Sequence, residues 1–461
     1  MKFSRRQFVA CSLALGMPQF AVAQDAAGFV ILTAEKSTMP LLSRSGPKTA
    51  VWRFLKEQPI AVLRAKQGQE FKGRIINRLN QDLWLHWFGV RGASTQMTLN
   101  VLPGDANAVE FAFTPPDAGT FWFGPMTQAS EQRDMGLYGM LIVEEVAALS
   151  PGFNDVPLIF DDWMIDDQGR SKGQFGDLET AIGEGRIGDW FTANGIFKSK
   201  IKIDRSKPAR LRILNAANAR VMNITFSGGG DLLLMALDGQ PVPPKPLAQG
   251  ILKLYPGQRA DLLLADVKNE IVVALDVLDS IVEIAYLEPF GTSAPAAVPE
   301  NFALPANPLS VLGDLAASRH IPIVIEGGAK GGLQSAKVGD KQLDMRGLLE
   351  KGLAWAFNGI AGVGGPPLFE VKKGETLVLD ISNKTSFPQP VHIHGHVWRL
   401  IESDGQAIEA APFMDTAIIP GLSSSKLAFV ADNVGLWVLQ SLVAERVDSG
   451  LIGAFSVLAA N

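Results

Sequence analysis

One pattern occurs three times along the chain, and it constrains the fold more than any other sequence feature. In each copy a polar strand is followed by a turn and then by an alternating strand that ends in asparagine, and the turn contains glycine in the first and third copies. The copies end at Asn77, Asn215 and Asn383, and Asn-Gly pairs at 194–195 and 358–359 precede the second and third copies. A repeat of about 140–170 residues predicts three similar domains.

The residues between the repeats predict strands nearly throughout. β-Rich runs such as Val272–Val277 are bounded by turn residues, and the chain holds 46 glycines and 28 prolines without a Gly-X-Y period. We therefore expect an all-β protein built from β-sandwiches or barrels. The expected domains are 28–147, 150–290 and 318–461, with a linker at 291–317 that is rich in proline and alanine.

The N-terminus has the features of an export signal. Arg5 and Arg6 precede Phe8, an apolar run extends to Phe20, and Ala21–Ala23 fits a small-residue cleavage site. We predict a twin-arginine signal peptide at 1–23 and a periplasmic location. No later apolar run reaches 18 residues, so stable membrane insertion is not expected.

Composition excludes several classes of function. Hydrophobic residues at 47% and charged residues at 19% exclude a disordered chain, and the net charge of −5 excludes the basic surface of a nucleic-acid-binding protein. The one cysteine, Cys11, lies inside the predicted signal, which excludes a disulfide framework and a cysteine-based metal site. Any metal site must use the five histidines.

Short motifs follow one another in a distinctive order. Leu85-His86-Trp87-Phe88-Gly89 precedes Asp117–Phe123 in the first domain, and Pro390-Val391-His392-Ile393-His394-Gly395-His396 precedes Asp448–Gly453 in the third. With Pro256–Asp261 in the second domain, these motifs resemble those of the three-domain multicopper oxidases, the laccase and copper-efflux oxidase family. The resemblance implies three cupredoxin-like Greek-key β-sandwich domains.

The resemblance also implies which copper ligands are missing. Such enzymes carry a blue copper, held by a cysteine and two histidines, and a three-copper cluster held by eight histidines. The cysteine position falls on Ser441, whose hydroxyl cannot replace a thiolate. Other ligand positions fall on Gln440, Leu442, Arg446, Gln389, Phe88, Gly124 and Met126. We therefore expect no type 1 copper site and few type 3 ligands.

Three histidines remain at ligand positions. The resemblance implies that His86 and His392 would hold the type 2 copper and that His394 would face the type 3 pair. His392 and His394 alternate along one strand and so share a face, and three imidazoles suit copper or zinc. Two interpretations stay open: relics packed at a domain interface, or a site for at most one copper ion.

Other candidate residues are given structural roles. His396 is expected to support the fold or the ligands, and His320 is expected at the surface. The acidic residues Asp161, Asp162, Asp166 and Asp167 are expected in a solvated loop. The methionines near the second motif are expected in the core.

Two functional hypotheses follow. The first is a non-enzymatic periplasmic scaffold or binding protein with an unidentified protein partner; a cell-division-associated protein that resembles multicopper oxidases and lacks copper ligands is a precedent. The second is a copper-binding oxidoreductase that uses one type 2-like copper and a small reductant. Four-copper laccase activity is expected to be absent, because reducing dioxygen to water needs four electrons and one copper stores one.

Overall fold

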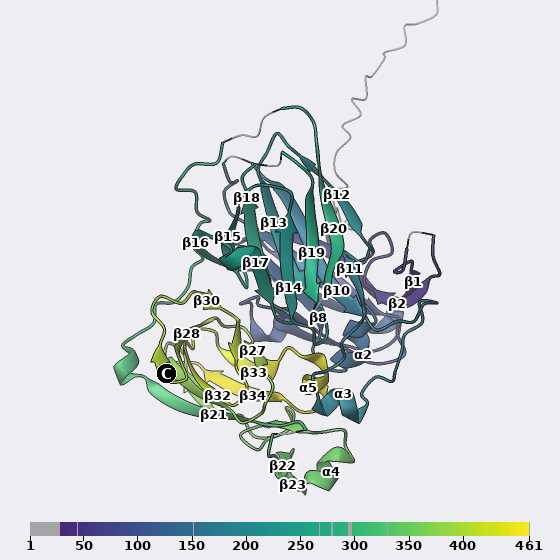
Figure 1. Cartoon of the computed structure of the whole chain (residues 1–461). Helices are drawn as coiled ribbons and strands as arrows, with labels where there is room; N and C mark the ends of the chain where they lie inside the picture. The colour runs from purple at the N-terminus through teal and green to yellow at the C-terminus, as the bar shows by residue number, and fades with distance from the viewer. Residues whose placement is uncertain are drawn as a thin grey trace, which may run out of the picture.

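The computed structural model describes residues 28–460 except 44, 151, 267, 278–279, 294–296 and 330. The predicted signal peptide at 1–23 lies outside the described residues. Strands dominate the described chain and form three pairs of sheets, with the second pair above the third in Figure 1 and the first behind them. This arrangement confirms the predicted all-β class; the exact domain boundaries stay predictions.

The strands of the first sandwich are β1 (Val30–Met39), β2 (Thr49–Arg53), β3 (Ala61–Lys66), β4 (Phe71–Asn77), β5 (Leu83–Phe88), β6 (Thr98–Val101), β7 (Val109–Phe113), β8 (Gly119–Pro125) and β9 (Gly139–Glu144). Their two sheets have the orders β2-β1-β4-β7 and β3-β9-β8-β5-β6.

The strands of the second sandwich are β10 (Asn154–Trp163), β11 (Trp190–Ala193), β12 (Ser199–Asp204), β13 (Ala209–Asn215), β14 (Met222–Ser227), β15 (Leu232–Leu237), β16 (Gln240–Pro246), β17 (Ile251–Leu254), β18 (Arg259–Leu264), β19 (Ile271–Val277) and β20 (Ser280–Phe290). Their sheets have the orders β11-β10-β13-β18-β15-β16 and β12-β20-β19-β14-β17.

The strands of the third sandwich are β21 (Arg319–Gly327), β24 (Trp355–Phe357), β25 (Glu370–Lys372), β26 (Thr376–Asn383), β27 (Gln389–Ile393), β28 (Trp398–Ser403), β29 (Gln406–Ala407), β30 (Phe413–Met414), β31 (Thr416–Ile419), β32 (Ser423–Val430), β33 (Gly435–Ser441) and β34 (Ile452–Leu458). One sheet has the order β24-β21-β26-β32-β28-β29, with β30 also paired to β28, and the other has the order β25-β34-β33-β27-β31.

The asparagine that ends each sequence repeat has the same structural role in all three sandwiches. The side-chain amides of Asn77, Asn215 and Asn383 are buried and end β4, β13 and β26. Each Oδ1 accepts a hydrogen bond from the backbone N–H two residues later. Each Nδ2 donates to the last carbonyl of β6, β17 or β31, an edge strand of the opposite sheet. The repeat therefore encodes a corner that ties the two sheets together.

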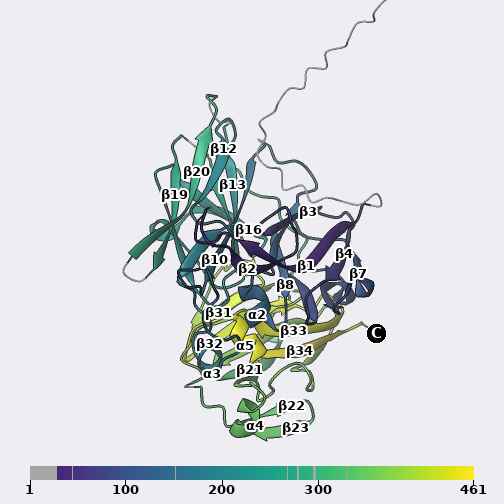
Figure 2. The same ribbon diagram turned by 90° about the vertical axis from the view of Figure 1, so that its right-hand side faces the viewer.

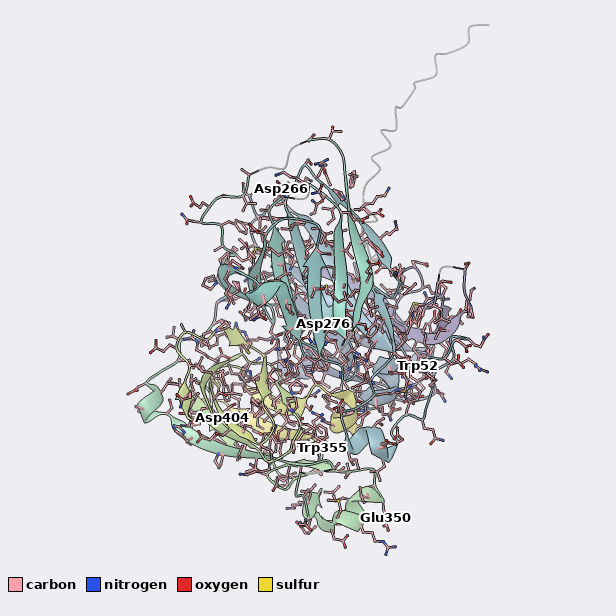
Figure 3. All side chains as sticks on the ribbon, viewed as in Figure 1. Trp52, Asp266, Asp276, Glu350, Trp355 and Asp404 are labelled. Atoms are coloured by element: carbon pink, nitrogen blue, oxygen red, sulfur yellow. The ribbon has the colours of Figure 1, made fainter. Side chains whose placement is uncertain are left out.

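Short helices lie between the sandwiches and at one end of the molecule. They are α1 (Ser94–Met97), α2 (Ala129–Asp134), α3 (Leu178–Ile182), α4 (Met345–Leu349) and α5 (Ala444–Asp448). In Figure 2, α2 of the first sandwich lies beside α5 of the third, and the two are in contact. With the hairpin β22 (Ser335–Val338) and β23 (Lys341–Asp344), α4 forms a lobe that projects from the third sandwich, with Glu350 at its end in Figure 3.

The three sandwiches meet around a shared buried cluster. It combines side chains of the first sandwich, such as Phe88 and Trp122, with Leu214 of the second and Leu442 of the third. Trp355, labelled in Figure 3, also joins the third sandwich to the second, because its Nε1 donates to the carbonyl of Ala181 at 2.7 Å. Within the described residues, no helix has the length and apolar character needed to cross a membrane.

Candidate metal centre

His86 lies on β5, where every side chain except that of Trp84 is buried. The pairing of β5 with β6 sets His86 opposite Thr98, and His86 Nδ1 lies 2.8 Å from Thr98 Oγ1. Its Nε2 is buried and has no hydrogen-bond partner. The ring is thus held by one nitrogen and presents the other to the interior.

His392 is held in the same way by the third sandwich. Its Nδ1 lies 3.1 Å from both Asp415 Oδ1 and Thr416 Oγ1. An ionised carboxylate only accepts hydrogen bonds, so Nδ1 of His392 is the donor. Nε2 of His392 is also buried without a partner.

His394 follows the end of β27 and has a different environment. The amide oxygen Oε1 of Gln440, on β33, accepts a hydrogen bond from His394 Nε2 at 3.1 Å. The imidazole ring stacks on that of His86, with centroids 3.7 Å apart and an interplanar angle of 26°. The ring centroids of His392 and His394 are 5.2 Å apart, and the two ring planes are inclined at 59°.

The structure brings all three predicted site histidines together, although His86 and His392 are 306 positions apart in the sequence. Their candidate ligand atoms lie within 4.8 Å of one another, and all three side chains are buried. Burial, and then the positive charge of a neighbouring imidazole, hold the pKa of His86 and of His394 well below its usual range. Both rings are therefore neutral near pH 7.

A buried charge network from the second sandwich supports His392. Arg259 donates from Nη1 and Nη2 to the two carboxylate oxygens of Asp415, at 3.0 and 2.5 Å, and from Nη1 to Asp238 Oδ1 at 3.2 Å. Burial raises the pKa of Asp415, but Arg259 and His392 outweigh it, and the pKa lies well below its usual range. A Cβ at Gly89 (φ +83°) would lie 2.4 Å from Asp415 Oδ2, so this close approach requires glycine.

Aromatic rings fill the space on one side of the histidines. The Phe88 ring centroid lies 4.7 Å from that of His86 and 5.6 Å from that of His392. The ring of Phe88 stacks on that of Trp122, with centroids 3.8 Å apart and an interplanar angle of 4°. On the same Trp122 ring, the guanidinium carbon of the buried Arg133 lies 5.1 Å from the centroid. Phe88 therefore packs directly against the histidines; the expectation of at most one copper ion stays a prediction.

The residues around Ser441 form a second, separate environment. Arg446 Nη1 donates to Gln389 Oε1 at 2.9 Å and to the carbonyl of Pro388 at 2.8 Å. The guanidinium carbon lies 5.1 Å from the Trp355 ring and 5.0 Å from the Phe387 ring. Burial lowers the pKa of Arg446 to about 10, so the group remains a cation at pH 7. Ser441 Oγ accepts a hydrogen bond from Val443 N at 3.2 Å.

The prediction that the acidic residues at 161–167 lie in a solvated loop was partly wrong. Asp161 and Asp162 lie on β10 and are buried, where Asp162 Oδ2 accepts from Arg220 Nε and Gly188 N, each at 2.7 Å. The prediction failed because partners from distant segments compensate the charge. Asp166, in contrast, caps an exposed turn through Arg170 N at 2.8 Å.

The remaining histidines have the roles expected from the sequence. His320 is exposed and pairs with Asp380 at 2.9 Å. His396 is buried, its Nδ1 lies 2.9 Å from the carbonyl of His394, and burial lowers its pKa to about 4. Sequence reasoning missed Asp415 and Arg133, because their importance depends on strands and helices from different sandwiches that no local motif links.

The fold and the buried imidazoles define a three-domain cupredoxin-like protein with a histidine cluster between its first and last sandwiches. Family models described as multicopper oxidase match residues 36–148 and 341–461, together about half of the chain. The chain belongs to the multicopper oxidase family.

Individual relatives cover the chain to different extents. The chain is 24% identical to the multicopper oxidase MmcO of Mycobacterium tuberculosis, over 95% of this chain and 93% of the relative. It is 28% identical to the cell division protein FtsP of Xenorhabdus nematophila, over 59% of this chain and 63% of the relative. The structure of a multicopper oxidase from Pseudomonas thermotolerans has a TM-score of 0.77 and 26% identity, over 92% of this chain and 98% of that one.

The family implies copper, and the donor set can be compared with that metal. Neutral imidazole is a common copper ligand, and the unpartnered Nε2 atoms of His86 and His392 are nitrogens of the required kind. Each ligand ring is oriented through its other nitrogen, as metal-binding histidines generally are. The residues present therefore fit one ion.

Proposed function

We propose that this chain is an exported, multicopper-oxidase-like protein that lacks the type 1 copper and most type 3 ligands, and that it acts as a scaffold or binding protein. It does not catalyse the four-electron reduction of dioxygen. The partner is a protein of the periplasm, reached by the twin-arginine route.

The observation that carries this proposal is the position of Arg446. Its guanidinium donates a hydrogen bond to Gln389 and lies 5.1 and 5.0 Å from the rings of Trp355 and Phe387. A permanent cation repels a copper ion, and no cysteine exists in the chain after residue 11. Without a thiolate there is neither a blue centre nor a rapid route for electrons into the protein.

The likeness to proteins named cell division protein FtsP supports a non-enzymatic role in the cell envelope. A fluorescent fusion in the source bacterium, built on an export-competent full chain, tests this role. We expect periplasmic fluorescence that depends on Arg5 and Arg6. Cytoplasmic fluorescence from the unaltered chain would contradict it.

Metal analysis after copper loading tests the loss of oxidase function directly. We expect no blue absorption band, no oxidation of phenolic laccase substrates, and fewer than two copper equivalents per chain. Four equivalents with a blue band would contradict the proposal.

A second candidate is favoured by one specific observation, the cluster of His86, His392 and His394. In this candidate the protein binds one copper ion at these residues, and the ion supplies one-electron chemistry toward a small reductant. One equivalent of copper that is lost in His86→Ala and kept in His320→Ala supports this candidate; zero equivalents leaves the scaffold role.

A further inference from the structure

A row of apolar side chains reaches the surface where the first and third sandwiches meet, with β33 below β8 in Figure 2. Trp84, on β5, lies beside Met126, whose backbone N–H donates to the carbonyl of Trp84 at 2.8 Å. Met126 is buried in a cluster that includes Val438 of β33. Leu436, two residues before Val438 on the same face of β33, is exposed. The row therefore runs from one sandwich to the other.

The part of this row on the third sandwich belongs to the outward face of a sheet. β33 and β34 pair with Leu436 opposite Ser456 and with Val438 opposite Ala454. Trp437 belongs to the hydrophobic core, so the alternate side chains of β33 face outward. The solvated face of an antiparallel sheet is ordinarily polar, whereas this outward face carries Leu436, Val438, Ala454, Ser456 and Leu458.

The strands that form this surface carry no charge. β5 and β6 on the first sandwich, and β33 and β34 on the third, contain no Asp, Glu, Lys or Arg. Charged side chains flank the surface at β25, where Glu370 and Lys372 are exposed. An apolar centre with a polar rim is the composition of a protein–protein interface. We call this surface the uncharged face; its residues are Trp84, Leu102, Val434, Leu436, Val438, Ala454, Ser456 and Leu458.

The uncharged face is large enough to bind another protein molecule. Trp84 is 39% exposed and Leu436 is 67% exposed, and Leu102, Val434 and Leu458 are exposed as well. Together these five residues present roughly 500 Å² to solvent, which is within the size range of apolar patches that mark interaction sites. Tryptophan is also one of the residue types that contribute most of the binding energy in protein interfaces.

The charge of the chain favours a second copy of itself as the occupant. Two copies with a net charge of −5 repel each other, so they approach most favourably where their surfaces are uncharged. In a two-fold pair the same surface lies on both sides of the contact, and apolar side chains are compatible with themselves. Two such surfaces bury roughly 1,000 Å², which is the lower limit for specific association.

We propose that two copies of this chain pair through the uncharged face, about a two-fold axis close to Leu436. The buried cluster of Met126 and Val438 lies directly behind this contact, so pairing extends the packing between the first and third sandwiches. The proposal depends neither on copper nor on a partner protein. The purified mature chain is therefore sufficient to test it.

Analytical ultracentrifugation of the mature chain over a wide range of concentrations measures self-association. We expect a reversible monomer–dimer equilibrium with a dissociation constant of about 1–100 µM, because an interface of this size lies at the weak end of specific association. Leu436→Lys should weaken the dimer at least roughly tenfold, since both copies then place an unpaired charge in the contact.

Ile281→Lys is the matched control for Leu436→Lys. Ile281 is 70% exposed and lies on β20 of the second sandwich, outside the uncharged face. Both substitutions add one positive charge, so they change the net charge of the molecule equally. Ile281→Lys should change the dissociation constant by less than about twofold, because an exposed charge outside the contact is screened by salt.

A single engineered thiol tests the position of the contact without altering any of the apolar side chains. The chain contains no cysteine after residue 11, so Ser456→Cys places one thiol opposite Leu436. We expect a short thiol-specific crosslinker to give a covalent dimer of Ser456→Cys. Ser280→Cys, at an exposed position on β20, is the control and should remain monomeric.

Several results would overturn the inference. These are a mature chain that stays monomeric at all concentrations, a dimer that persists in Leu436→Lys, and equal crosslinking of Ser456→Cys and Ser280→Cys. If the chain stays monomeric and Leu436→Lys abolishes the binding of another periplasmic protein, the uncharged face serves that protein and self-pairing is wrong. The scaffold proposal would remain intact in that case.

Discussion

At the scale of single residues, one buried cation determines the character of the region around Ser441. Arg446 is held by Gln389, by the carbonyl of Pro388 and by two aromatic rings. These partners fix the guanidinium from several sides within a packed interior.

We therefore predict that Ser441→Cys alone does not create a blue copper centre. Copper-loaded Ser441→Cys should show no intense visible band, because the thiolate lacks imidazole partners and Arg446 opposes the ion. The triple variant Ser441→Cys, Gln389→His, Arg446→His should gain such a band. An intense band in the single variant would show that Arg446 is not an obstacle.

At the scale of elements, the asparagine corners explain why the sequence repeat survives where other positions diverge. Asn383 accepts from Thr385 N at 3.0 Å and donates to the carbonyls of Phe387 and Ile419 at 2.8 and 3.2 Å. A buried amide with several backbone partners joins the end of β26 to the end of β31. No other side chain of this size supplies both donors and an acceptor.

Removal of this amide should cost stability in proportion to the groups left unpaired. We expect Asn383→Ala to lower the free energy of unfolding by about 1–3 kcal/mol, because buried backbone groups lose their partners. The exposed Asn107, which donates to the carbonyl of Pro103, is the matched control, and Asn107→Ala should cost less than about 1 kcal/mol. Urea unfolding measures both, and equal costs would refute the role of the corner.

The contact of α2 with α5 contains ionisable groups from all three sandwiches. Asp448 accepts hydrogen bonds from Ala129 N and Ser130 N, and Glu445 Oε1 accepts from Asn218 Nδ2 at 3.0 Å. The ionisable groups in and beside this contact are Arg133, Asp134, Glu184, Arg186, Glu445, Arg446 and Asp448. Burial raises the pKa of Glu445 to about 7 and that of Asp134 to about 6.

This contact should weaken as pH rises. A carboxyl group with a raised pKa in the folded state holds its proton more tightly there, so the unfolded chain ionises first and stability falls between about pH 4.5 and 7. For Glu445 the loss is on the order of 3 kcal/mol. Denaturant unfolding at pH 5, 6, 7 and 8 measures how the free energy of unfolding depends on pH. In Glu445→Gln this contribution to the pH dependence should be absent. Glu409 is exposed, and Glu409→Gln is the control that should keep the pH dependence of the unaltered protein. If Glu445→Gln also kept it, Glu445 would not be the group responsible.

At the scale of the whole molecule, Arg259 connects the three sandwiches. It lies on β18 of the second sandwich, donates from Nε to the carbonyl of Thr120 in the first at 3.2 Å, and pairs with Asp415 in the third. Its side chain is fully buried. The same residue therefore stabilises the assembly and, through Asp415, orients His392.

Loss of Arg259 should affect stability and the histidine cluster together. Arg259→Met leaves Asp238 and Asp415 buried without their cation, and we expect a loss of about 3–5 kcal/mol. Arg74→Met removes an exposed pair with Glu110 and should cost about 1 kcal/mol or less. Nitrogen-15 NMR should also report a changed environment of the His392 ring in Arg259→Met. If Arg259→Met were as stable as Arg74→Met, the Arg259 network would not stabilise the packing of the three sandwiches.

The sequence by itself determined the class of fold and the identity of the surviving histidines. The spacing of Asn77, Asn215 and Asn383 specified three sandwiches, because each asparagine makes its hydrogen bonds within its own domain. Local patterns are sufficient for features of this kind. They also placed His320 at the surface, and they failed for Asp161, whose partner Tyr138 comes from another domain.

Only the tertiary structure decided how the histidines are arranged. The stacking of His86 on His394, the support of His392 by Asp415 and the packing of Arg446 all join residues from different strands, and several join different sandwiches. Which atoms meet there depends on how the completed domains dock, and docking is a property of whole surfaces. A motif identifies the residues that can reach a site, whereas the packing of three domains sets the orientation of the rings and the charges that surround them.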